Sequence, residues 1–329
     1  MKKNILTYSS ISSFLNCRKL YKYRYIDELV PITKDKNLKL GNDIHNFLAD
    51  WHRYNDRFNL IDTIDNYYKN KEQNEDNKSN YNLAKVMMLS YIERYPSEEF
   101  IPVVLEETFE NNIINPSTNY SSRNFIISGK VDGLIQYPDG TYYLLEHKTT
   151  SNIAGSYLER LWTDFQISLY SYYIEQSKGI EIDGVLYNIL TKAKLRQGKE
   201  ETEKEFYERR MNLISKSKKG NSNAKRKLAE SDLYFQKRLK EKYKEPTMFH
   251  REKIYISKDS LEKVNEHIWN ISKSILSAFN KNNFYPNPSY CFNYNKPCSY
   301  YPICSSNENP IIIENYFNKS KPNGELRNF

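Results

Sequence analysis

The chain has 329 residues, with 49 Lys and Arg against 41 Asp and Glu and a net charge of +8, so it can bury one large core and suits a polyanionic partner such as DNA. No run is apolar and long enough to cross a bilayer, and the first ten residues turn polar too early for a signal peptide. These features argue against a membrane or secreted protein, and we expect a cytoplasmic protein whose four cysteines bind metal rather than form disulfides.

The N-terminal segment is expected to be helical. Serines able to cap a helix precede an apolar face in residues 9–25, and this helix carries Cys17 in its middle. A second helix is expected over residues 39–51, where His45 lies beside apolar neighbours. An isolated histidine in such a place is more often structural than a metal ligand, and His52 is expected to be a surface residue.

A polar helical region is expected over residues 56–95, broken by a solvated loop in the run KNKEQNEDNKSN. From residue 101 onwards the apolar residues change to the two-residue period of strands. Glu107, on the first of these strands, can approach a metal, although a lysine partner or solvent explains it equally well.

The stretch from residue 128 to residue 150 is expected to form two strands joined by a tight turn at residues 138–140. Asp132 lies on the first strand, and Glu146 and Lys148 lie on the second. Side chains two residues apart on a strand share a face, so Glu146 and Lys148 point the same way.

Two carboxylates and an ammonium in one neighbourhood predict a divalent metal site. Grouped carboxylates at the end of an apolar strand are costly to bury unless a cation pairs with them. Carboxylate oxygens bind Mg²⁺ or Mn²⁺ while leaving positions open for water and a phosphate, and a nearby lysine can orient the water or stabilise developing charge. The alternative is a surface hairpin with an ordinary Glu–Lys ion pair.

A helix is expected over residues 155–177, after the second strand. Gln166 and Tyr170 are four residues apart and share one face of it. They are either incidental polar residues or residues that orient the active site or contact DNA. A strand over residues 182–190 follows, and strands, helix and strand in this order predict a mixed α/β sheet.

Residues 192–245 form a strongly basic insertion, with 18 Lys and Arg against nine Asp and Glu. All of the chain's excess positive charge therefore lies in this segment. Its centre, KSKKGNSNAKRK, is expected to be mobile, and its flanks are expected to be helical. A charge run is often only a solvated face, but this concentration of charge favours an arm that guides DNA.

The C-terminal region is expected to contain a strand over residues 247–256 and a long helix over residues 259–281. A turn rich in Pro and Tyr then carries three cysteines, which are Cys291, Cys298 and Cys304. The remaining residues, 305–329, hold few apolar side chains and are expected to be a loose tail.

The ordered set of motifs resembles the PD-(D/E)XK nuclease superfamily and, within it, the RecB-like exonucleases. G-x-x-D at residues 129–132 and E-x-K at residues 146–148 resemble the nuclease core. G-x-x-x-H at residues 41–45 resembles the first RecB-like motif, and Q-x-x-x-Y at residues 166–170 resembles the motif that follows E-x-K. Each motif alone is weak, but all occur in the family's order over nearly the whole chain.

The resemblance implies which residues hold the metal and what the protein does. His45, Asp132, Glu146 and the main-chain carbonyl of His147 would bind Mg²⁺ or Mn²⁺, and Lys148 would assist the attacking water. The implied activity is a metal-dependent DNA exonuclease acting on single strands or ends, as in CRISPR adaptation nucleases and their phage relatives. The alternatives are a structure-specific endonuclease or nickase, and a non-catalytic DNA-binding module on a nuclease fold.

The resemblance also implies a second metal centre. Cys17 together with the three C-terminal cysteines matches the family's ligands to a 4Fe–4S cluster. The spacing here, C-x₆-C-x₅-C, departs from the family's C-x₂-C-x₅-C, which leaves a zinc site with four cysteine ligands as the alternative.

These features together predict one nuclease domain over residues 1–304, with a restriction-endonuclease-like core in which helices flank a mixed central sheet. Within it, a basic helical insertion occupies residues 192–246. A cluster-binding segment at residues 286–304 is joined to the N-terminal segment by the four-cysteine cluster. No G-x-x-x-x-G-K-[ST] phosphate loop occurs, so we expect no helicase motor in this chain. It would either degrade ends unaided or act with another protein, such as a helicase or a recombination or CRISPR adaptation partner.

Overall fold

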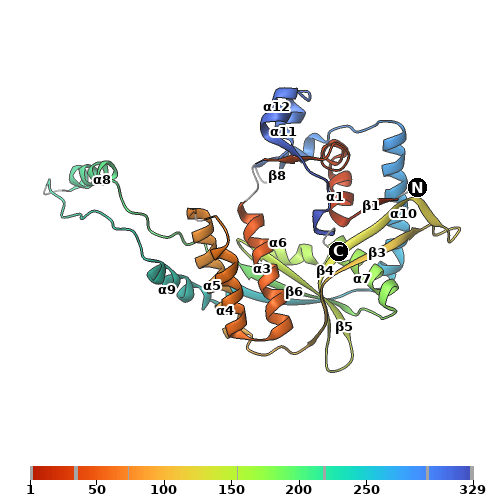
Figure 1. Cartoon of the computed structure of the whole chain (residues 1–329), viewed down its shortest axis with the longest axis horizontal. Helices are drawn as coiled ribbons and strands as arrows, with labels where there is room; N and C mark the ends of the chain where they lie inside the picture. The colour runs from red at the N-terminus through yellow and green to blue at the C-terminus, as the bar shows by residue number, and fades with distance from the viewer. Residues whose placement is uncertain are drawn as a thin grey trace.

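The computed structural model describes residues 3–32, 36–72, 74–153, 155–217, 220–293 and 296–326. At its centre is a six-stranded sheet with the order β1-β4-β5-β6-β7, in which β3 pairs with the opposite edge of β4 (Figure 1). The strands are β1 (Asn4–Leu6), β3 (Ile101–Ile114), β4 (Ser121–Gln136), β5 (Tyr142–Thr150), β6 (Gly184–Thr191) and β7 (Phe249–Tyr255).

The sheet mixes parallel and antiparallel pairs. β1 is parallel to β4 and β5 is parallel to β6, whereas β3–β4, β4–β5 and β6–β7 are antiparallel. Parallel neighbours need a long crossover connection. Helices α6 (Gly155–Leu161) and α7 (Phe165–Lys178) provide it between β5 and β6. The predicted mixed α/β sheet flanked by helices is confirmed.

One edge of β4 is shared by two strands. β1 pairs with residues 125–127 of β4, and β5 pairs with residues 133–136. Residues 128–132 lie between these two pairings, so β5 separates from β4 at Asp132 and the sheet opens there. We call this opening the fork.

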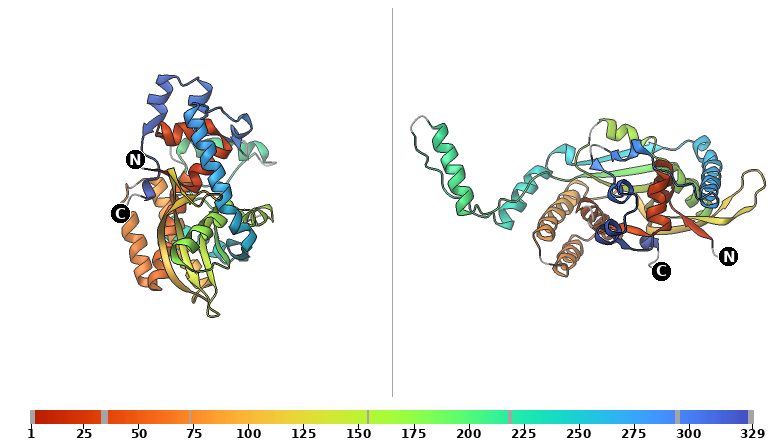
Figure 2. Two further views of the ribbon diagram at one scale, coloured as in Figure 1. Left: turned by 90° about the vertical axis from the view of Figure 1, so that its right-hand side faces the viewer. Right: turned by 90° about the horizontal axis from the view of Figure 1, so that it is seen from above.

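Helices cover both faces of the sheet (Figure 2). α3 (Lys36–Tyr54), α4 (Arg57–Lys69) and α5 (Glu75–Arg94) share one apolar core on one face. α7 and α10 (Lys258–Asn280) share a second apolar core with the other face. No helix in the described ranges is long and apolar enough to cross a membrane.

The two ends of the chain pack against each other (Figure 1). β2 (Leu29–Pro31) pairs antiparallel with β10 (Phe317–Lys319), next to α12 (Pro310–Tyr316). Phe317 is 5% exposed and belongs to an apolar cluster with N-terminal residues. The expectation of a loose tail is therefore wrong for the part of this tail that the structure describes, up to residue 326, because β10 pairs with β2 and Phe317 is buried against the N-terminal segment.

The cysteine-bearing segments are irregular. The helix expected over residues 9–25 breaks at Cys17, whose backbone is extended between α1 (Tyr8–Asn16) and α2 (Arg18–Tyr21), so the prediction of a mid-helix cysteine is wrong. A π-helical turn follows at Lys22–Ile26. The C-terminal cysteines lie among short elements, which are β8 (Phe292–Asn293), β9 (Lys296–Pro297) and α11 (Tyr301–Ser305).

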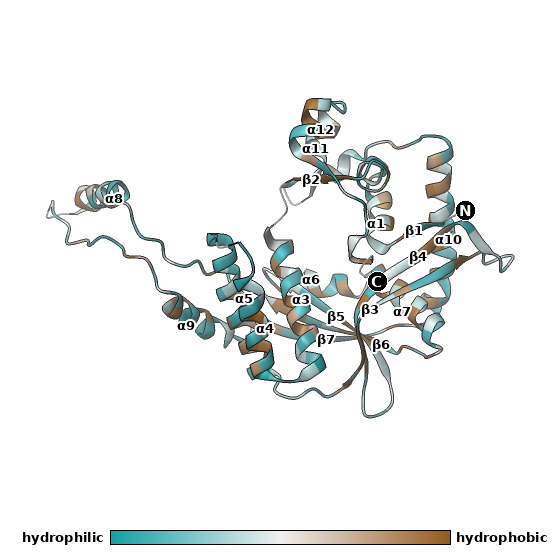
Figure 3. Cartoon of the chain, viewed as in Figure 1, coloured by the Kyte–Doolittle hydropathy of each residue, from teal (hydrophilic) through white to brown (hydrophobic). Residues whose placement is uncertain are grey.

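The basic insertion projects from the body as an arm that carries α9 (Asp232–Tyr243) near its base and α8 (Glu203–Lys216) near its tip (Figure 1). None of the described residues of α8 is buried. The segments that connect α8 to β6 and to α9 are mostly hydrophilic, whereas part of α8 is apolar (Figure 3). The flanks are helical as predicted, while residues 218–219 of the expected mobile centre lie outside the described residues.

Two further expectations about helices need correction. The second half of the polar run expected to be a loop is the first part of α5, because Asn74 caps that helix by accepting from the N–H of Asn77. The single helix expected over residues 155–177 is divided into α6 and α7 by a turn. Asp164 ends this turn as the N-cap of α7.

Candidate active site

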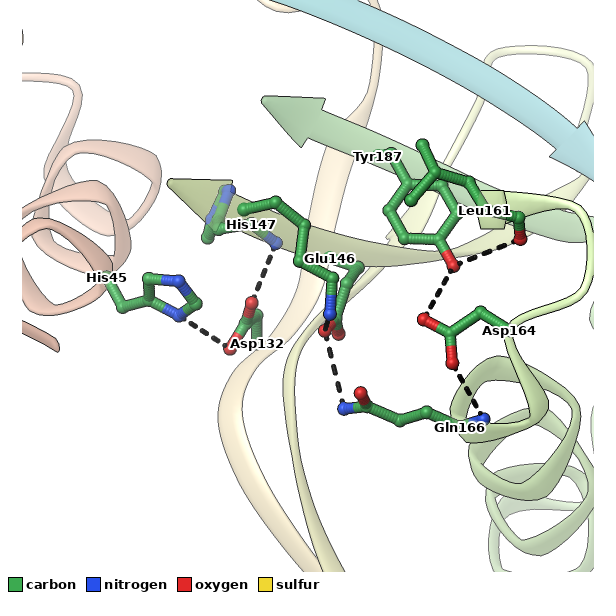
Figure 4. A network of polar contacts seen from close by, with 9 residues as sticks. His45, Asp132, Glu146, His147, Leu161, Asp164, Gln166 and Tyr187 are labelled. Atoms are coloured by element: carbon green, nitrogen blue, oxygen red, sulfur yellow. Dashed lines mark hydrogen bonds and ion pairs between the residues drawn. The ribbon is translucent and has the colours of Figure 1, made fainter. Parts of the chain in front are cut away.

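The fork brings Asp132 to the side of β5 (Figure 4). β4 and β5 no longer pair beyond Gly133, and the main-chain N–H of His147 donates instead to Asp132 Oδ2 at 2.7 Å. Asp132 Oδ1 lies 3.2 Å from His45 Nδ1. One carboxylate therefore joins β4, β5 and helix α3.

Helix α3 can approach the sheet closely because residue 41 is glycine. A Cβ atom at Gly41 would lie 3.1 Å from Thr149 Oγ1 on β5, which is tighter than an ordinary contact. His45 follows about one helical turn later on the same side of α3 and reaches Asp132. The G-x-x-x-H spacing thus has a steric reason in this fold.

Glu146 and Lys148 lie on the face of β5 that α7 covers, as the two-residue period of a strand predicts. Lys148 Nζ lies 2.6 Å from Glu146 Oε1. Gln166 Nε2, which comes from α7, lies 3.4 Å from the same oxygen. Glu146 is only 6% exposed, so a buried carboxylate, an ammonium and an amide meet beside the fork (Figure 4).

The electrostatics separate the two carboxylates. Burial raises the pKa of Glu146 to about 7, against the opposing effect of the Lys148 ammonium. Burial alone would also raise the pKa of Asp132, but the His45 imidazole and the His147 N–H lower it to about 2. Burial disfavours the charge on Lys148, yet Glu146 raises the pKa of Lys148 above its usual range. Near neutral pH, Asp132 and Lys148 are therefore charged, whereas Glu146 is partly protonated. A cation bound beside Glu146 would favour its ionised form.

Tyr170 lies in the wall of the site. It is 8% exposed, and its ring meets Phe109 edge-on with 5.4 Å between the ring centroids. Gly129 leaves room for both rings. The first residue of the G-x-x-D motif and the last residue of the Q-x-x-x-Y motif therefore meet through packing.

We expect Gly129→Ala to destabilise the protein. A Cβ atom at residue 129 would lie 2.7 Å from the Phe109 ring and 2.9 Å from the Tyr170 ring, and overpacking of this kind costs about 1–3 kcal/mol. The urea midpoint of the variant should fall accordingly. Gly155→Ala is the matched control because a Cβ there meets nothing within 4 Å. Equal midpoints for the two variants would contradict this packing argument.

The side chain of His147 lies on the opposite face of β5 from Glu146, where its ring meets that of His45 edge-on with 5.7 Å between the centroids. His147 Nδ1 lies 3.1 Å from Asn188 Nδ2, and its ring stacks on that of His52 with 5.4 Å between centroids. His52 is 7% exposed, so the prediction that it is a surface residue is wrong. Burial lowers the pKa of His147 to about 3 and that of His52 well below its usual value, which keeps both rings neutral.

Glu107 pairs with Lys178 at 2.5 Å, which is the lysine partner that the sequence left open.

Three residues beside the site were missed by the sequence analysis. Asp164 accepts from the N–H of Gln166 at 3.0 Å, and an aspartate two residues before the glutamine is a recognisable N-cap signal.

The other two missed residues are tyrosines without any local signal. Tyr187 stands opposite Glu146 in the parallel register of β5 and β6, and its hydroxyl lies 3.3 Å from Asp164 Oδ2. Tyr8, the first residue of α1, is acted on by the same group, since burial and then the charge of Asp164 raise the pKa of its hydroxyl. Only the folded chain brings these side chains to the site.

The four cysteines line one pocket between the N- and C-terminal segments, together with Tyr23, Asn287 and Tyr300 among others. The N–H of Asn287 donates to Cys17 Sγ at 3.4 Å. The N–H of Cys298 donates to the carbonyl oxygen of Cys291 at 2.8 Å. Burial raises the pKa of Cys298, and the other three thiols raise it further. Cysteines that are distant in sequence are thus close in space.

The donors at the fork fit a hard cation by their chemistry. Across the described ranges, no three His, Cys, Asp or Glu side chains take up a metal-ligating arrangement. At the fork the carboxylate oxygens are instead hydrogen-bonded to His45, Lys148 and the main chain. Two carboxylates and an imidazole are nevertheless a donor set for Mg²⁺ or Mn²⁺, and the raised pKa of Glu146 shows that positive charge nearby does not offset its burial. The thiols of the second pocket suit a softer metal.

Comparisons with known proteins give one finding. A model of the PD-(D/E)XK nuclease superfamily matches residues 5–305. The match runs from β1 to α11, so it includes the fork, the residues around it and all four cysteines. A comparison with curated proteins gives no match.

Proposed function

Because the chain belongs to the PD-(D/E)XK nuclease superfamily, we propose that it is a RecB-like, metal-dependent deoxyribonuclease that degrades single-stranded DNA or DNA ends as an exonuclease. The observation that supports this most is the meeting of His45, Asp132 and Glu146 with Lys148 at the fork. A surface hairpin with an ordinary ion pair would be exposed, whereas Glu146 is buried.

The residues at the fork have different roles in this proposal. His45, Asp132, Glu146 and the main-chain carbonyl of His147 would hold Mg²⁺ or Mn²⁺, which supplies charge stabilisation at the phosphate and lowers the pKa of a bound water. Lys148, kept charged by Glu146, stabilises negative charge that develops on the phosphate and orients the attacking water. Gln166 and the N–H of His147 fix the directions of the two carboxylates.

Linear and circular single-stranded DNA separate the proposed exonuclease from an endonuclease or nickase. An exonuclease releases nucleotides from linear strands labelled at one end and leaves the circle intact, and a chelator stops the reaction. Cleavage of the circle would favour the endonuclease. Labels at the 5′ and 3′ ends also give the polarity of digestion.

A non-catalytic DNA-binding module is the second candidate function. It is less favoured because the imidazole, both carboxylates and the lysine are all present and meet in space. Binding without metal-dependent release of nucleotides would favour this candidate. The chain carries no phosphate loop for a motor, so in this proposal it either degrades ends unaided or acts with a partner that opens duplexes, such as a helicase or a recombination or CRISPR adaptation complex.

We also propose that Cys17, Cys291, Cys298 and Cys304 bind a 4Fe–4S cluster, with zinc as the alternative. Their common pocket and their mutual effect on pKa support this proposal. Four thiolates there would connect the first and last segments of the domain, so the metal would stabilise the fold rather than take part in hydrolysis.

The arm is proposed to guide DNA, and this predicts a change in salt dependence. Lys204, Arg210 and Lys216 on α8 are exposed. Replacing all three with glutamine should reduce the slope of log affinity against log salt for single strands by about 2, at roughly 0.7 per lost phosphate contact. The slope is measured by titrating a labelled oligonucleotide at several salt concentrations.

The matched control for the arm replaces three exposed lysines at the opposite end of the molecule, which are Lys263, Lys273 and Lys281 on or just after α10. This control removes the same charge from the whole protein. If both triple variants change the slope equally, the arm has no special role and the effect reflects net charge alone.

A further inference from the structure

The turn between α6 and α7 is fixed to the sheet beside the fork. The Tyr187 hydroxyl on β6 lies 3.3 Å from Asp164 Oδ2 and 3.5 Å from the Leu161 carbonyl oxygen, which are the two ends of this turn (Figure 4). Within the turn, the N–H groups of Trp162 and Thr163 donate back to the last residues of α6 at 3.3 and 3.2 Å. Tyr187 is fully buried, so its hydroxyl makes these contacts away from water.

This anchored turn presents a large aromatic side chain to solvent. Trp162 is 59% exposed, whereas Trp51 is 6% exposed and Trp269 is partly buried. Consecutive Cα atoms are about 3.8 Å apart, so the Cα of Trp162 lies within about 8 Å of that of Asp164. Asp164 in turn acts electrostatically on Lys148. The backbone of the exposed Trp162 is therefore close to a carboxylate that acts on the charged residues at the fork.

The short helix α6, which ends just before Trp162, carries both an aromatic and a basic side chain, Tyr157 and Arg160. Tyr157 on α6 is raised in pKa by burial, while the charges of Lys148 and Arg160 oppose this rise. Both cations therefore act electrostatically on its hydroxyl. Aromatic side chains beside positive charge are the usual features of sites for single-stranded nucleic acid, because the charges follow the backbone and the rings stack on bases.

We propose that Trp162 is a stacking platform for an unpaired base, next to the point where the backbone is cleaved. The proposal rests on the proposed nuclease function of the same site and names the substrate class more closely. In a duplex the faces of internal bases are covered by their neighbours, so a platform of this kind selects single strands or frayed ends. The contacts of Tyr187 with the turn hold the backbone of Trp162 in place before the DNA strand binds.

The test uses binding without cleavage. Oligothymidylate is titrated into the full chain in the presence of a chelator, with tryptophan fluorescence and the anisotropy of a labelled strand as readouts. Trp162→Ala should weaken binding of the single strand by about 5–150-fold, the equivalent of about 1–3 kcal/mol for one stacked base. Trp162→Phe should keep most of the affinity but lose most of the fluorescence quenching. A blunt duplex should bind all of these proteins equally.

Tyr120→Ala is the control, because Tyr120 is 78% exposed and lies in the distant β3–β4 connection. The platform is wrong if Trp162→Ala binds oligothymidylate as tightly as the parent chain, or if it loses affinity for duplex and single strand alike. If Trp162→Ala weakens single-strand binding but the parent chain releases no nucleotides with Mn²⁺, the nuclease proposal fails and only the stacking role of Trp162 is retained. If it cleaves and Trp162→Ala binds normally, only the platform fails.

Discussion

Lys148→Ala is expected to lower the rate of Mn²⁺-dependent nucleotide release by about 10²–10³-fold, while binding to DNA persists. Lys148 forms an ion pair with Glu146 at the fork. Removing a group that stabilises charge in the transition state lowers the rate by about 10²–10³-fold. Rates are measured on end-labelled single strands at saturating DNA, with anisotropy as the separate measure of binding. Asp132→Ala should lose activity to at least the same extent, since it removes the carboxylate that joins His45 to β5.

Lys258→Ala is the matched control for this experiment. Lys258 is also a lysine paired with a glutamate, Glu181, but it is the first residue of α10, and the two side chains are 77% and 64% exposed. Its loss should leave the rate within about twofold of the parent, as expected for an exposed ion pair. Equal activity of the parent, Lys148→Ala and Asp132→Ala would point to a contaminating nuclease and would contradict the assignment of the site.

Replacing a pocket cysteine is expected to have the largest effect on stability. Cys298→Ser removes one of four thiols that border the same pocket, and a structural metal held by thiolates contributes on the order of 10 kcal/mol of binding free energy. That is comparable with the whole stability of a typical domain. The variant should lose its metal, and proteases should cleave near residues 286–304. Metal content, sulfide content and the thermal midpoint are measured on protein purified without oxygen.

Ser289→Ala serves as the control, because Ser289 lies two residues from Cys291 and carries no thiol. A brown parent protein with stoichiometric iron and sulfide supports the cluster, and zinc without sulfide would replace it by the zinc alternative. An unchanged metal content and midpoint in Cys298→Ser would show that the pocket is not a metal centre.

Local periodicity was enough to predict the pairs that lie on one element. Glu146 and Lys148 are two apart on a strand, and Gln166 and Tyr170 are four apart on a helix. The sheet class followed from the order of these elements. Such predictions succeed because the geometry of a strand or a helix fixes the relative directions of near neighbours.

Contacts between distant segments could not be predicted in this way. His52 was expected at the surface, but its position depends on how closely α3 approaches His147. Tyr187 reaches the site only because β6 pairs in parallel with β5. Cys17 was placed in mid-helix because apolar periodicity continues past it, whereas the chain there bends toward Asn287. Each of these positions depends on a partner far away in the sequence or on the register between strands.

Helix α1 links the two centres of the molecule. Its first residue, Tyr8, borders the charged group at the fork, and Cys17 follows directly after its last turn. Its nine residues, at about 1.5 Å each, give this helix a length of roughly 14 Å. If the thiols hold an oxygen-sensitive cluster as proposed, damage to that cluster in air would free the C-terminal end of α1 and make Tyr8, beside the active site, more mobile. Exposure to air would then lower the activity although the catalytic residues are chemically unchanged.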